Sequence, residues 1–392
     1  MKKATPTPES VPAWEDGAPS PRPKALSSSD HKMEKEPTEF EYMELLGSGS
    51  YGRVVRVRDK KDPSKLYAMK IMDKQQIANV HGRKHLSRCK RERKWLVELG
   101  CGRSDQPQHP YLVRLEYEMN TKNRVYLILE LARRGDLSDV VKKSGPLPLE
   151  TCRLVAAELM LAVAMLHKHK LIHRDIRPHN ILLADSGHIQ LTDLGVAGRN
   201  SSPHFFVIGA SGYKAPEMLL SRKKGYTHSL DIWCIGVTLY LLHSGYKHPM
   251  KRFLKDKILK ASLKSKDFDV SSFEFDPTFF SDKAKDLISK LMDPNPSTRL
   301  GSPRIHADPK DDKEAEASPI PLPKKEIRNH PYFSGIDWLA LARKEGPVPF
   351  PETLVPIPEL DVNAVPKFKN HIEVLAEFNK KDPTLLIAEM FA

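Results

Sequence analysis

The sequence predicts an α+β protein of two lobes, a small strand-rich lobe followed by a larger and mainly helical one. In the first part Val54, Val55 and Val57 alternate with arginines, as in a half-buried strand. Residues 125–129 form a short apolar run bounded by polar residues, which also indicates a buried strand. After residue 135 the apolar residues recur at helical spacing over long stretches.

The other elements follow in order along the chain. The apolar run at 66–72 predicts a further strand, and residues 86–99 suit a helix with one apolar face. The strongest helix candidates of the second lobe are residues 151–169, 231–244 and 283–292.

Composition divides the chain into four parts. Residues 1–38 hold seven prolines and a serine cluster but almost no large apolar residue, which is typical of a disordered tail. The small lobe is expected at 39–131 and the large lobe at 132–333. Within the large lobe, residues 303–325 combine prolines with five charges of each sign and are expected to form a solvated loop insertion. Residues 334–392 form a C-terminal tail.

The overall composition excludes several classes of protein. The chain has 392 residues, 40% of them hydrophobic and 29% charged, as in a soluble globular protein. Its longest apolar stretch, residues 154–166, contains Glu158 and is too short to span a bilayer. The four cysteines lack the spacing of zinc or disulfide frameworks, and no secretory signal is recognised. We therefore expect a reducing, cytoplasmic location.

Glycines stand at positions 47, 49 and 52, a spacing that dinucleotide-binding folds also use. In those folds a helix opens after the third glycine. Here the strand pattern from Val54 onward follows instead, which predicts a hairpin whose backbone amides lie over the phosphates of a nucleotide. Taken alone, the motif is equally compatible with a plain hairpin turn.

Lys70 closes an apolar strand 18 residues beyond Gly52, where a lysine can reach the α- and β-phosphates of a nucleotide. Such a lysine requires an acidic partner on the following helix. Glu92 stands alone among seven basic residues at 83–94 and has the right position to hold Lys70. A surface lysine and a local charge balance are the alternative interpretations.

The most specific constellation lies at residues 173–180 and 193–195. Phosphoryl transfer needs a base near the acceptor hydroxyl and oxygen ligands for Mg²⁺. Asp175 suits the base, and Asn180 and Asp193 supply hard oxygen donors for the metal ion.

Over residues 40–333 the chain resembles a eukaryotic protein kinase, because these motifs are followed by Ala-Pro-Glu at 215–217, by Asp231 and by Arg299. The resemblance implies the two-lobed protein-kinase fold. It also implies that Glu217 pairs with Arg299 and that Asp231 anchors the backbone of the catalytic loop.

Further segments narrow the resemblance. Three of them are similar to segments of the AGC group of kinases, in which a proline-rich C-terminal tail folds back over the small lobe. Within that group, the closest similarity is to the kinase domain of the G-protein-coupled receptor kinases. The AGC segments are residues 297–301, 330–333 and 336–338, and the receptor-kinase segments are residues 187–195, Pro203-His204, Val207, Gly209, Gly212-Tyr213 and 359–364.

The resemblance implies ATP as the phosphate donor and Mg²⁺ as the metal. It assigns catalytic roles to Asp175, Lys70, Glu92 and Arg177, and metal binding to Asn180 and Asp193. The residues expected to contact the nucleotide are Leu46, Gly47, Ser48, Gly49, Ser50, Tyr51, Gly52, Val54, Ala68, Lys70, Glu130, Ala132 and Leu182.

Two departures from the family pattern concern the rate of transfer. Arg177 replaces the usual lysine two residues after the catalytic aspartate, although its planar guanidinium can still contact a γ-phosphate. Ala210 replaces a threonine whose hydroxyl commonly bonds to the catalytic aspartate. A catalytically silent scaffold is therefore the alternative to an active enzyme.

Two other departures concern specificity and activation. His179 stands where kinases that select basic substrates have a glutamate, so arginine-directed specificity is not expected, although Asp136 keeps one acidic group nearby. Phe206 occupies the position in the activation loop that is phosphorylated in many relatives, which leaves Arg174 without a phosphate there. Ser201 and Ser202 are alternative sites for such a phosphate.

The formal charge of +13 is concentrated in two stretches, with +6 at residues 83–94 and +7 at 247–266. Such runs are ordinarily solvated helix faces. Their functional interpretation is attraction to an anionic membrane or to an acidic docking partner, and no nucleic-acid motif accompanies them. The sequence thus predicts a monomeric serine/threonine kinase acting on acidic or membrane-associated protein substrates.

Overall fold

The computed structural model describes most of the chain from residue 37 onward. The described residues are 37–49, 52–81, 86–99, 109–200, 204, 207–220, 225–251, 255–265, 268–302, 318, 320–359, 367–370 and 373. The predicted tail at 1–36, most of the predicted insertion at 303–325, and Ser201, Ser202 and Phe206 lie outside these residues.

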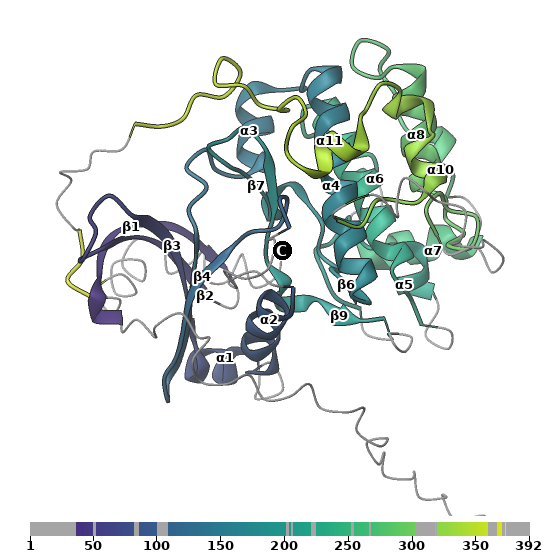
Figure 1. The fold of residues 1–392 in the computed structure, drawn as a ribbon. Coiled ribbons are helices and arrows are strands. Elements are labelled where there is room, and N and C mark those ends of the chain that lie inside the picture. The colour runs from purple at the N-terminus through teal and green to yellow at the C-terminus, as the bar shows by residue number, and fades with distance from the viewer. Residues whose placement is uncertain are drawn as a thin grey trace, which may run out of the picture. The chain divides into compact units, whose positions relative to one another are not determined.

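Five antiparallel strands form the main sheet, in the order β1-β2-β3-β5-β4 (Figure 1). The 3₁₀ turn η1 (Pro37–Glu39) leads into the sheet, and the helices α1 and α2 follow β3. The strands are β1 (Phe40–Gly49), β2 (Gly52–Asp59), β3 (Leu66–Asp73), β4 (Leu115–Asn120) and β5 (Arg124–Glu130), and the helices are α1 (Lys74–His81) and α2 (Leu86–Glu98).

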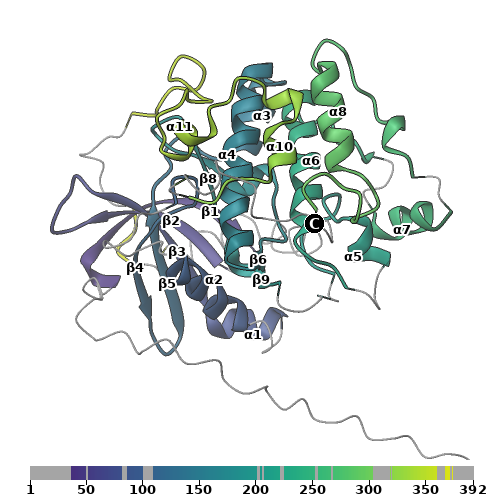
Figure 2. The same cartoon turned by 45° about the vertical axis from the view of Figure 1, so that its right-hand side comes forward.

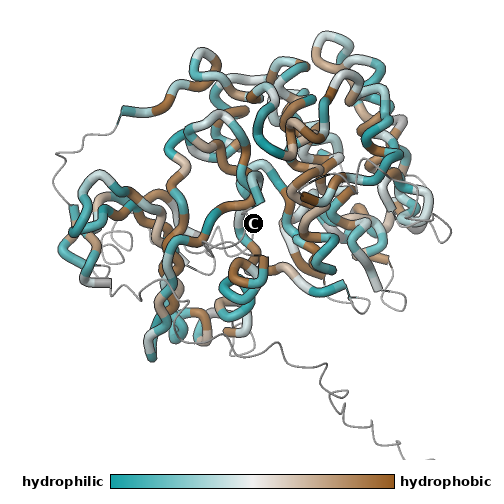
Figure 3. Tube along the Cα trace, viewed as in Figure 1, coloured by the Kyte–Doolittle hydropathy of each residue, from teal (hydrophilic) through white to brown (hydrophobic). Residues whose placement is uncertain are grey.

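The sheet buries both of its faces. Along β2 buried and half-buried residues alternate, as the period of a strand requires. One face carries a separate core that includes Val55, Val57 and Met69, and the other carries Ala68 and Met72, which belong to the main core of the protein. Figure 3 shows the same alternation of hydrophobic and hydrophilic residues along the strands.

Helices dominate the chain after β5, as Figure 2 shows. Every residue of α6 is buried, which marks it as the central helix of this lobe. The helices are α3 (Leu137–Ser144), α4 (Leu149–Lys168), α5 (Pro216–Leu220), α6 (Ser229–Ser244), α7 (Asp256–Ser265), α8 (Asp282–Leu291), α10 (Lys325–Arg328) and α11 (Trp338–Ala342). Among the described residues, no helix is long and apolar enough to cross a membrane.

Short elements lie between α4 and α5, where the sequence predicted the chemistry. Two two-stranded sheets form here, one from β6 (Leu171–Ile172) and β9 (Gly198–Arg199), the other from β7 (Ile181–Leu183) and β8 (Ile189–Leu191). The 3₁₀ turns η3 (Pro178–Asn180) and η4 (Leu194–Val196) accompany them, and η6 (Val270–Ser272) and η8 (Pro331–Phe333) occur later in the chain.

The C-terminal tail contacts both lobes. The Phe350 amide donates to the Gly187 carbonyl at 3.2 Å, and Gly187 has φ +85° with the Phe350 carbonyl only 2.5 Å from where a Cβ would lie. Farther along, the Phe368 amide donates to the Tyr42 carbonyl of β1 at 3.2 Å (Figure 1). The described part of the tail therefore contacts β1 of the small lobe, in agreement with what the resemblance implies.

The predicted strands and helices agree with the structure to within about two residues, but one basic run is helical only in part. The charge pattern at 247–266 is that of a solvated helix face. Among the described residues of this run, α7 (Asp256–Ser265) is α-helical, whereas residues 247–250 lie in coil and turns after α6. Gly245 ends α6 with φ +67°, and Tyr246 also has a positive φ of 70°, so the helix cannot continue.

The predicted pair of Glu217 and Arg299 is present and buried. The Arg299 guanidinium donates to both carboxylate oxygens, at 2.7 and 2.9 Å, and also to the Ser229 and Asp293 carbonyls. The Trp233 ring lies 5.2 Å from the guanidinium. The pair thereby connects α5, α6 and the segment after α8.

Replacing Glu217 by alanine should destabilise the protein by about 3–5 kcal/mol, because it leaves the fully buried Arg299 without its counter-charge. Urea unfolding of purified protein measures this loss. The control is Lys290→Ala, which removes a half-exposed pair with Asp286 and should cost at most about 1 kcal/mol. Equal losses in the two variants would contradict the importance assigned to the buried pair.

Candidate active site

Lys70 lies in the middle of the sheet, opposite Val54 of β2 and Leu127 of β5. Its ammonium donates to both carboxylate oxygens of Glu92 in α2, at 2.7 and 2.8 Å, and to Oδ1 of Asp193 at 3.0 Å. The structure thus brings together three predicted residues from β3, α2 and the segment before η4. The predicted contact between Lys70 and Glu92 is confirmed.

The ammonium of Lys70 and the two carboxylates act on one another's pKa, and the carboxylates also repel each other. Burial would lower the pKa of Lys70, but the carboxylates of Asp193 and Glu92 outweigh it and raise the pKa above its usual value. Burial raises the pKa of Glu92 even though Lys70 opposes the rise. Burial also acts to raise the pKa of Asp193, but Lys70 lowers it overall. Lys70 therefore stays protonated and Asp193 stays ionised at neutral pH.

Asp193 has a left-handed backbone, with φ 65° and ψ 72°. Its side chain caps η4, because Oδ1 accepts from the Gly195 amide at 3.4 Å. A non-glycine residue in this region is strained, and such strain concentrates at functional sites. The side chain remains 41% exposed, so it is accessible to a ligand.

Helix α2 is attached to the segment after Asp193 at two further points. The Trp95 indole donates to the Ala197 carbonyl at 3.3 Å, and Arg199 pairs with Glu98 at 2.5 Å. The position of Glu92 is therefore coupled to the position of Asp193 by contacts from the second half of α2.

Asp231 of α6 anchors the catalytic loop, as predicted. Its two carboxylate oxygens accept from the His173 and Arg174 amides, each at 2.9 Å, and Oδ2 also contacts Nε2 of His167 at 2.9 Å. Burial would raise the pKa of Asp231, but the bond from His167 and these neighbours lower it overall. A buried, ionised carboxylate thus fixes the backbone just ahead of Asp175.

Three groups surround the carboxylate of Asp175. Asn180 donates from Nδ2 to Oδ2 at 2.9 Å, the Ala210 amide donates to Oδ1 at 3.2 Å, and Nε of Arg177 lies 3.6 Å from Oδ2. The backbone of Ala210 therefore makes a contact that the missing threonine hydroxyl was expected to provide. Arg177 lies beside Asp175, which suits the role predicted for it.

The residues present fit a magnesium ion. Nδ2 of Asn180 donates to the Asp175 carbonyl at 2.7 Å and to the Asp175 carboxylate at 2.9 Å. The amide oxygen of Asn180 is therefore left to face a cation. With the ionised Asp193 this makes two hard oxygen donors, a set that suits Mg²⁺ when phosphates complete the coordination. No cluster of three or more His, Cys, Asp or Glu side chains forms a metal site within the described part of the chain.

Several of the residues predicted to contact the nucleotide are apolar, and they come from both lobes. Leu46 falls at an irregularity in the β1–β2 pairing and is 44% exposed, although it is apolar. Val54 of β2 and Leu182 of β7 are partly buried against the same core as Ala68 of β3. An apolar surface from both lobes is thus available for a planar base.

The tip of the β1–β2 hairpin is only partly described. Gly47, Ser48 and Gly49 pair across to β2, whereas Ser50 and Tyr51 lie outside the described residues. A Cβ at Gly52 would lie 2.5 Å from the Ile71 carbonyl, so the close approach of β2 to β3 requires glycine there.

Glu130 and Ala132 connect the lobes. The Glu130 carboxylate accepts from Nε2 of Gln190 at 2.9 Å, so this side chain is engaged within the protein. The Ala132 carbonyl accepts from the Gly135 amide at 3.4 Å. Gln190 of β8 is a partner that sequence reasoning did not identify.

A polar network surrounds His179, beside the catalytic loop. Its Nε2 lies 3.1 Å from the Ser138 hydroxyl and its Nδ1 lies 3.2 Å from the Tyr246 hydroxyl, and these two hydroxyls are 2.9 Å apart. Burial, together with Arg177 and Lys142, lowers the pKa of His179 to about 4. Sequence reasoning identified His179 but not Ser138 and Tyr246, which only the fold brings to it.

Asp136, the acidic group that the sequence indicated near His179, caps a helix. Its Oδ1 accepts from the Asp139 amide at 3.0 Å and caps the start of α3. Burial raises the pKa of this carboxyl.

Sequence reasoning also missed a partner of Arg174. NH1 of Arg174 lies 3.4 Å from Nδ1 of His204, a residue that the sequence offered only as part of the resemblance to receptor kinases.

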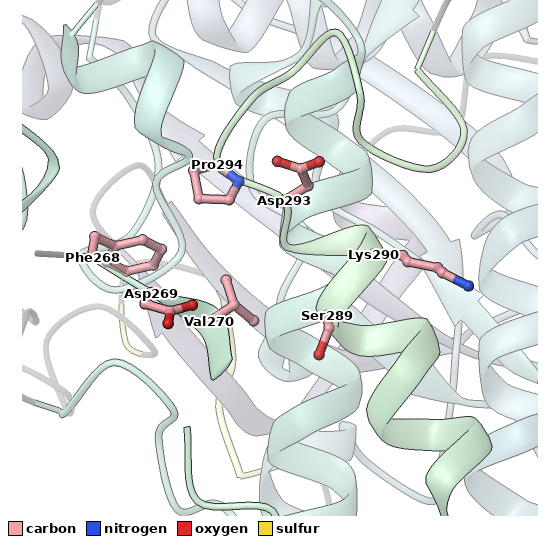
Figure 4. Close-up of a pocket in the computed structure, with 7 residues that line it drawn as sticks. All are labelled: Phe268, Asp269, Val270, Ser289, Lys290, Asp293 and Pro294. Atoms are coloured by element: carbon pink, nitrogen blue, oxygen red, sulfur yellow. The ribbon is translucent and has the colours of Figure 1, made fainter. Parts of the chain in front are cut away.

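A cavity of about 260 Å³ lies away from these residues, between η6 and α8 (Figure 4). Its polar wall is already bonded, because Asp293 accepts from the Asn295 amide and from the Thr298 hydroxyl. The lining residues are Phe268, Asp269, Val270, Ser289, Lys290, Asp293 and Pro294. None of the predicted site residues is among them.

Comparisons with known proteins agree with this geometry. Residues 40–309 match the family model of the protein kinase domain. The chain is 32% identical over 312 residues to the serine/threonine-protein kinase AtPK1/AtPK6 of Arabidopsis thaliana, which covers 78% of the chain and 58% of that protein. It is 34% identical over 340 residues to human ribosomal protein S6 kinase alpha-2, which covers 83% of the chain and 40% of that protein.

These relatives are AGC-group kinases, as the sequence motifs indicated, and none of them is a receptor kinase. The matched region spans about half of the length of the relatives. The family model covers more than half of the chain, and its region contains the sheet, the Lys70 cluster and the catalytic loop. The chain belongs to the protein kinase family, with a β-sheet N-lobe and a helical C-lobe.

Proposed function

We propose that the chain is an active serine/threonine kinase that transfers the γ-phosphoryl group of MgATP to a protein hydroxyl. The observation that carries the proposal is the contact of Lys70 with both Glu92 and Asp193. This contact requires α2 and the segment before η4 to be placed together, which is the arrangement that phosphoryl transfer needs.

Asp175 is the residue proposed to orient the acceptor hydroxyl and to receive its proton. Asn180 and the Ala210 amide hold its carboxylate in one orientation, so little reorganisation accompanies the reaction. Arg177 adds a positive charge beside the carboxylate, where it can stabilise the transferred phosphoryl group.

Lys70 is proposed to hold the α- and β-phosphates, because its ammonium is fixed at the cleft and stays protonated. Mg²⁺, when bound by Asn180 and Asp193, neutralises charge on the phosphates. Leu46, Val54, Ala68 and Leu182 supply the apolar surface for the base, as described above.

A catalytically silent scaffold is the alternative, motivated by Arg177, Ala210 and Phe206. The bond from the Ala210 amide to Asp175 favours the active enzyme, since this contact does not depend on a side-chain hydroxyl. The finer resemblance to receptor kinases stays a prediction, because the AGC relatives reported above are S6 kinases and plant kinases.

The network around His179 supports a preference for acidic over arginine-rich substrates. No carboxylate belongs to the described group of Ser138, His179 and Tyr246, and Asp136 is committed to a helix cap. The ammonium of Lys142 lies 4.9 Å from the centre of the Tyr246 ring. Arg177 and Lys142 bring positive charge to this group, and Asp139 and Asp175 bring negative charge. The described network therefore offers an arginine no carboxylate of its own, unlike the glutamate that stands at position 179 in kinases that select basic substrates.

The exposed lysines around the start of α7 support docking to an anionic membrane surface. Lys251, Lys255 and Lys257 are exposed, and no acidic side chain of the described residues pairs with them. Each lysine near an anionic bilayer contributes about 1 kcal/mol of attraction. Substrates on such a surface would be concentrated near the enzyme.

Replacing Asp175 by asparagine should lower phosphotransfer by about 10²–10⁴-fold, because the general base is lost. Transfer of labelled phosphate from ATP to a generic protein substrate measures this effect, and Lys70→Met should abolish autophosphorylation. Ser289→Ala, in the remote cavity, serves as the control and should leave the rate unchanged. Binding of MgATP without any phosphotransfer by the unaltered protein would support the scaffold instead.

A positional peptide library should show no selection for arginine before the acceptor residue, and some selection for acidic residues. His179→Glu should then create a preference for arginine of about tenfold, the size of one charge-assisted contact. His179→Gln keeps a neutral polar side chain and is the matched control. Strong selection for arginine by the unaltered kinase would refute the proposed specificity.

Changing Lys251, Lys255 and Lys257 together to glutamine should weaken binding to phosphatidylserine vesicles by roughly 10²-fold. Sedimentation with vesicles measures the binding, with neutral vesicles as the baseline. A matched control replaces three scattered exposed lysines, Lys122, Lys168 and Lys283, with the same change in net charge. Equal losses in both triple variants would show that only total charge matters and would remove the proposed docking surface.

A further inference from the structure

The side chain of Arg174 is buried, yet its partners are neutral. Its Nε donates to the Val196 carbonyl at 2.6 Å, and NH1 reaches Nδ1 of His204 at 3.4 Å. The guanidinium also donates a hydrogen bond to the Tyr226 hydroxyl. Burial raises the pKa of Tyr226, and this bond opposes the rise. Among the described residues, no Asp or Glu forms an ion pair with Arg174.

Backbone contacts fix the position of His204. Its amide donates to the Tyr226 carbonyl at 3.3 Å, and the Tyr226 amide donates back at 3.0 Å. The two rings stack with centroids 5.6 Å apart. Nε2 of His204 lies 2.5 Å from the Arg199 carbonyl at the end of β9. The imidazole therefore lies between the catalytic loop and β9.

These partners determine the protonation state of the imidazole. Nε2 faces a carbonyl and must donate, whereas Nδ1 faces the N–H of a guanidinium and must accept. Only the neutral ring with its proton on Nε2 satisfies both contacts. An imidazolium would instead point a second N–H at Arg174 and bring two cations together.

We propose that His204, in its neutral form, is a positioning residue that holds Arg174 in place of a phosphate on the activation segment. The proposal rests on the kinase activity proposed above, because it concerns how that active site is kept in order. Phe206 gives the expected phosphorylation position no hydroxyl, so a different acceptor for Arg174 is required. His204 provides that acceptor without any modification.

Arg174 can transmit this contact to the reacting groups. It directly precedes Asp175, and its amide is bonded to Asp231, with a strained φ of 70°. Its Nε bond reaches Val196 in η4, the turn that Asp193 caps. A Cβ at Gly198 would lie 2.6 Å from the guanidinium, so the side chain has no room to move toward β9.

Acid should weaken the contact. Burial and Arg174 lower the pKa of His204, so the neutral form prevails at neutral pH. As the pH falls through the lowered pKa, the imidazolium loses its bond to Arg174. The groups that face this site are Arg174 from the catalytic loop, Tyr226 across the bridge with Asp231 beside it, and Arg199 of β9, whose side chain pairs with Glu98.

Two variants separate the proposed role from simple packing. His204→Phe keeps a ring to stack on Tyr226 but has no acceptor, and should lower kcat by about 10- to 100-fold, the value of a hydrogen bond to a charged group, with KM for ATP unchanged. His204→Glu has no ring but offers Arg174 a carboxylate, and should keep activity within about threefold of the unaltered kinase. Its acid limb of activity should also move to lower pH.

The reverse pattern, with His204→Phe active and His204→Glu inactive, would overturn the proposal and leave His204 a packing residue. Thermal melts show whether each variant folds. If either variant fails to fold, His204→Gln takes its place: its side-chain amide has both an acceptor and a donor, so this variant should be active. Phosphatase treatment of the unaltered kinase should leave its activity intact. Loss of activity on that treatment would also overturn the proposal.

A measurement without turnover distinguishes this proposal from the proposed function. The ¹⁵N resonances of the histidine rings, with His204 assigned from the His204→Phe spectrum, should show a neutral Nε2–H ring at pH 7. Arg174→Met should raise the pH at which this ring titrates. An imidazolium or an Nδ1–H ring at pH 7 would overturn the role of His204, whether or not the chain transfers phosphate.

Discussion

The contact of one partly buried lysine with two carboxylates is the constraint on which the rest of the site depends. Lys70 lies in the sheet, Glu92 on a helix and Asp193 in the large lobe, so one ammonium joins three separate parts of the chain. The pair is buried on the Glu92 side, where a lost partner would leave an uncompensated charge. Separating α2 from the segment of Asp193 would therefore cost free energy, because it would break the contacts of Lys70.

Asp231 plays the same part for the catalytic loop. Its buried carboxylate accepts hydrogen bonds from two backbone amides and contacts His167. These bonds hold Arg174 at a positive φ that a non-glycine residue rarely adopts. Asp175 then needs only local contacts, from Asn180 and from the Ala210 amide. Asp231 of α6 thus fixes the backbone of the catalytic loop, and Asn180 and the Ala210 amide orient the carboxylate of Asp175.

The sequence predicted those parts that repeat a local pattern or a spaced motif. The strands, the long helices and the Lys70–Glu92 contact follow from the type and spacing of their residues, and the Glu217–Arg299 pair is implied by the resemblance to protein kinases. The network of Ser138, His179 and Tyr246 could not be predicted, because three distant segments meet only in the fold. The contact of His204 with Arg174 was missed for the same reason. The basic run at 247–266 is helical only in part, because charge alone does not determine where a helix begins.

The departures from the family pattern share one electrostatic effect. A glutamate is replaced by His179, and the phosphorylated position is occupied by Phe206, so two sources of negative charge are missing around the cleft while Arg174 and Arg177 remain. A buried arginine with a neutral histidine partner keeps its full positive charge, whereas a phosphate would cancel it. The loop that holds the base therefore carries more positive charge than the family pattern provides. This excess of positive charge agrees both with the proposed role of His204 as a neutral partner of Arg174 and with the proposed preference for substrates that bring negative charge themselves.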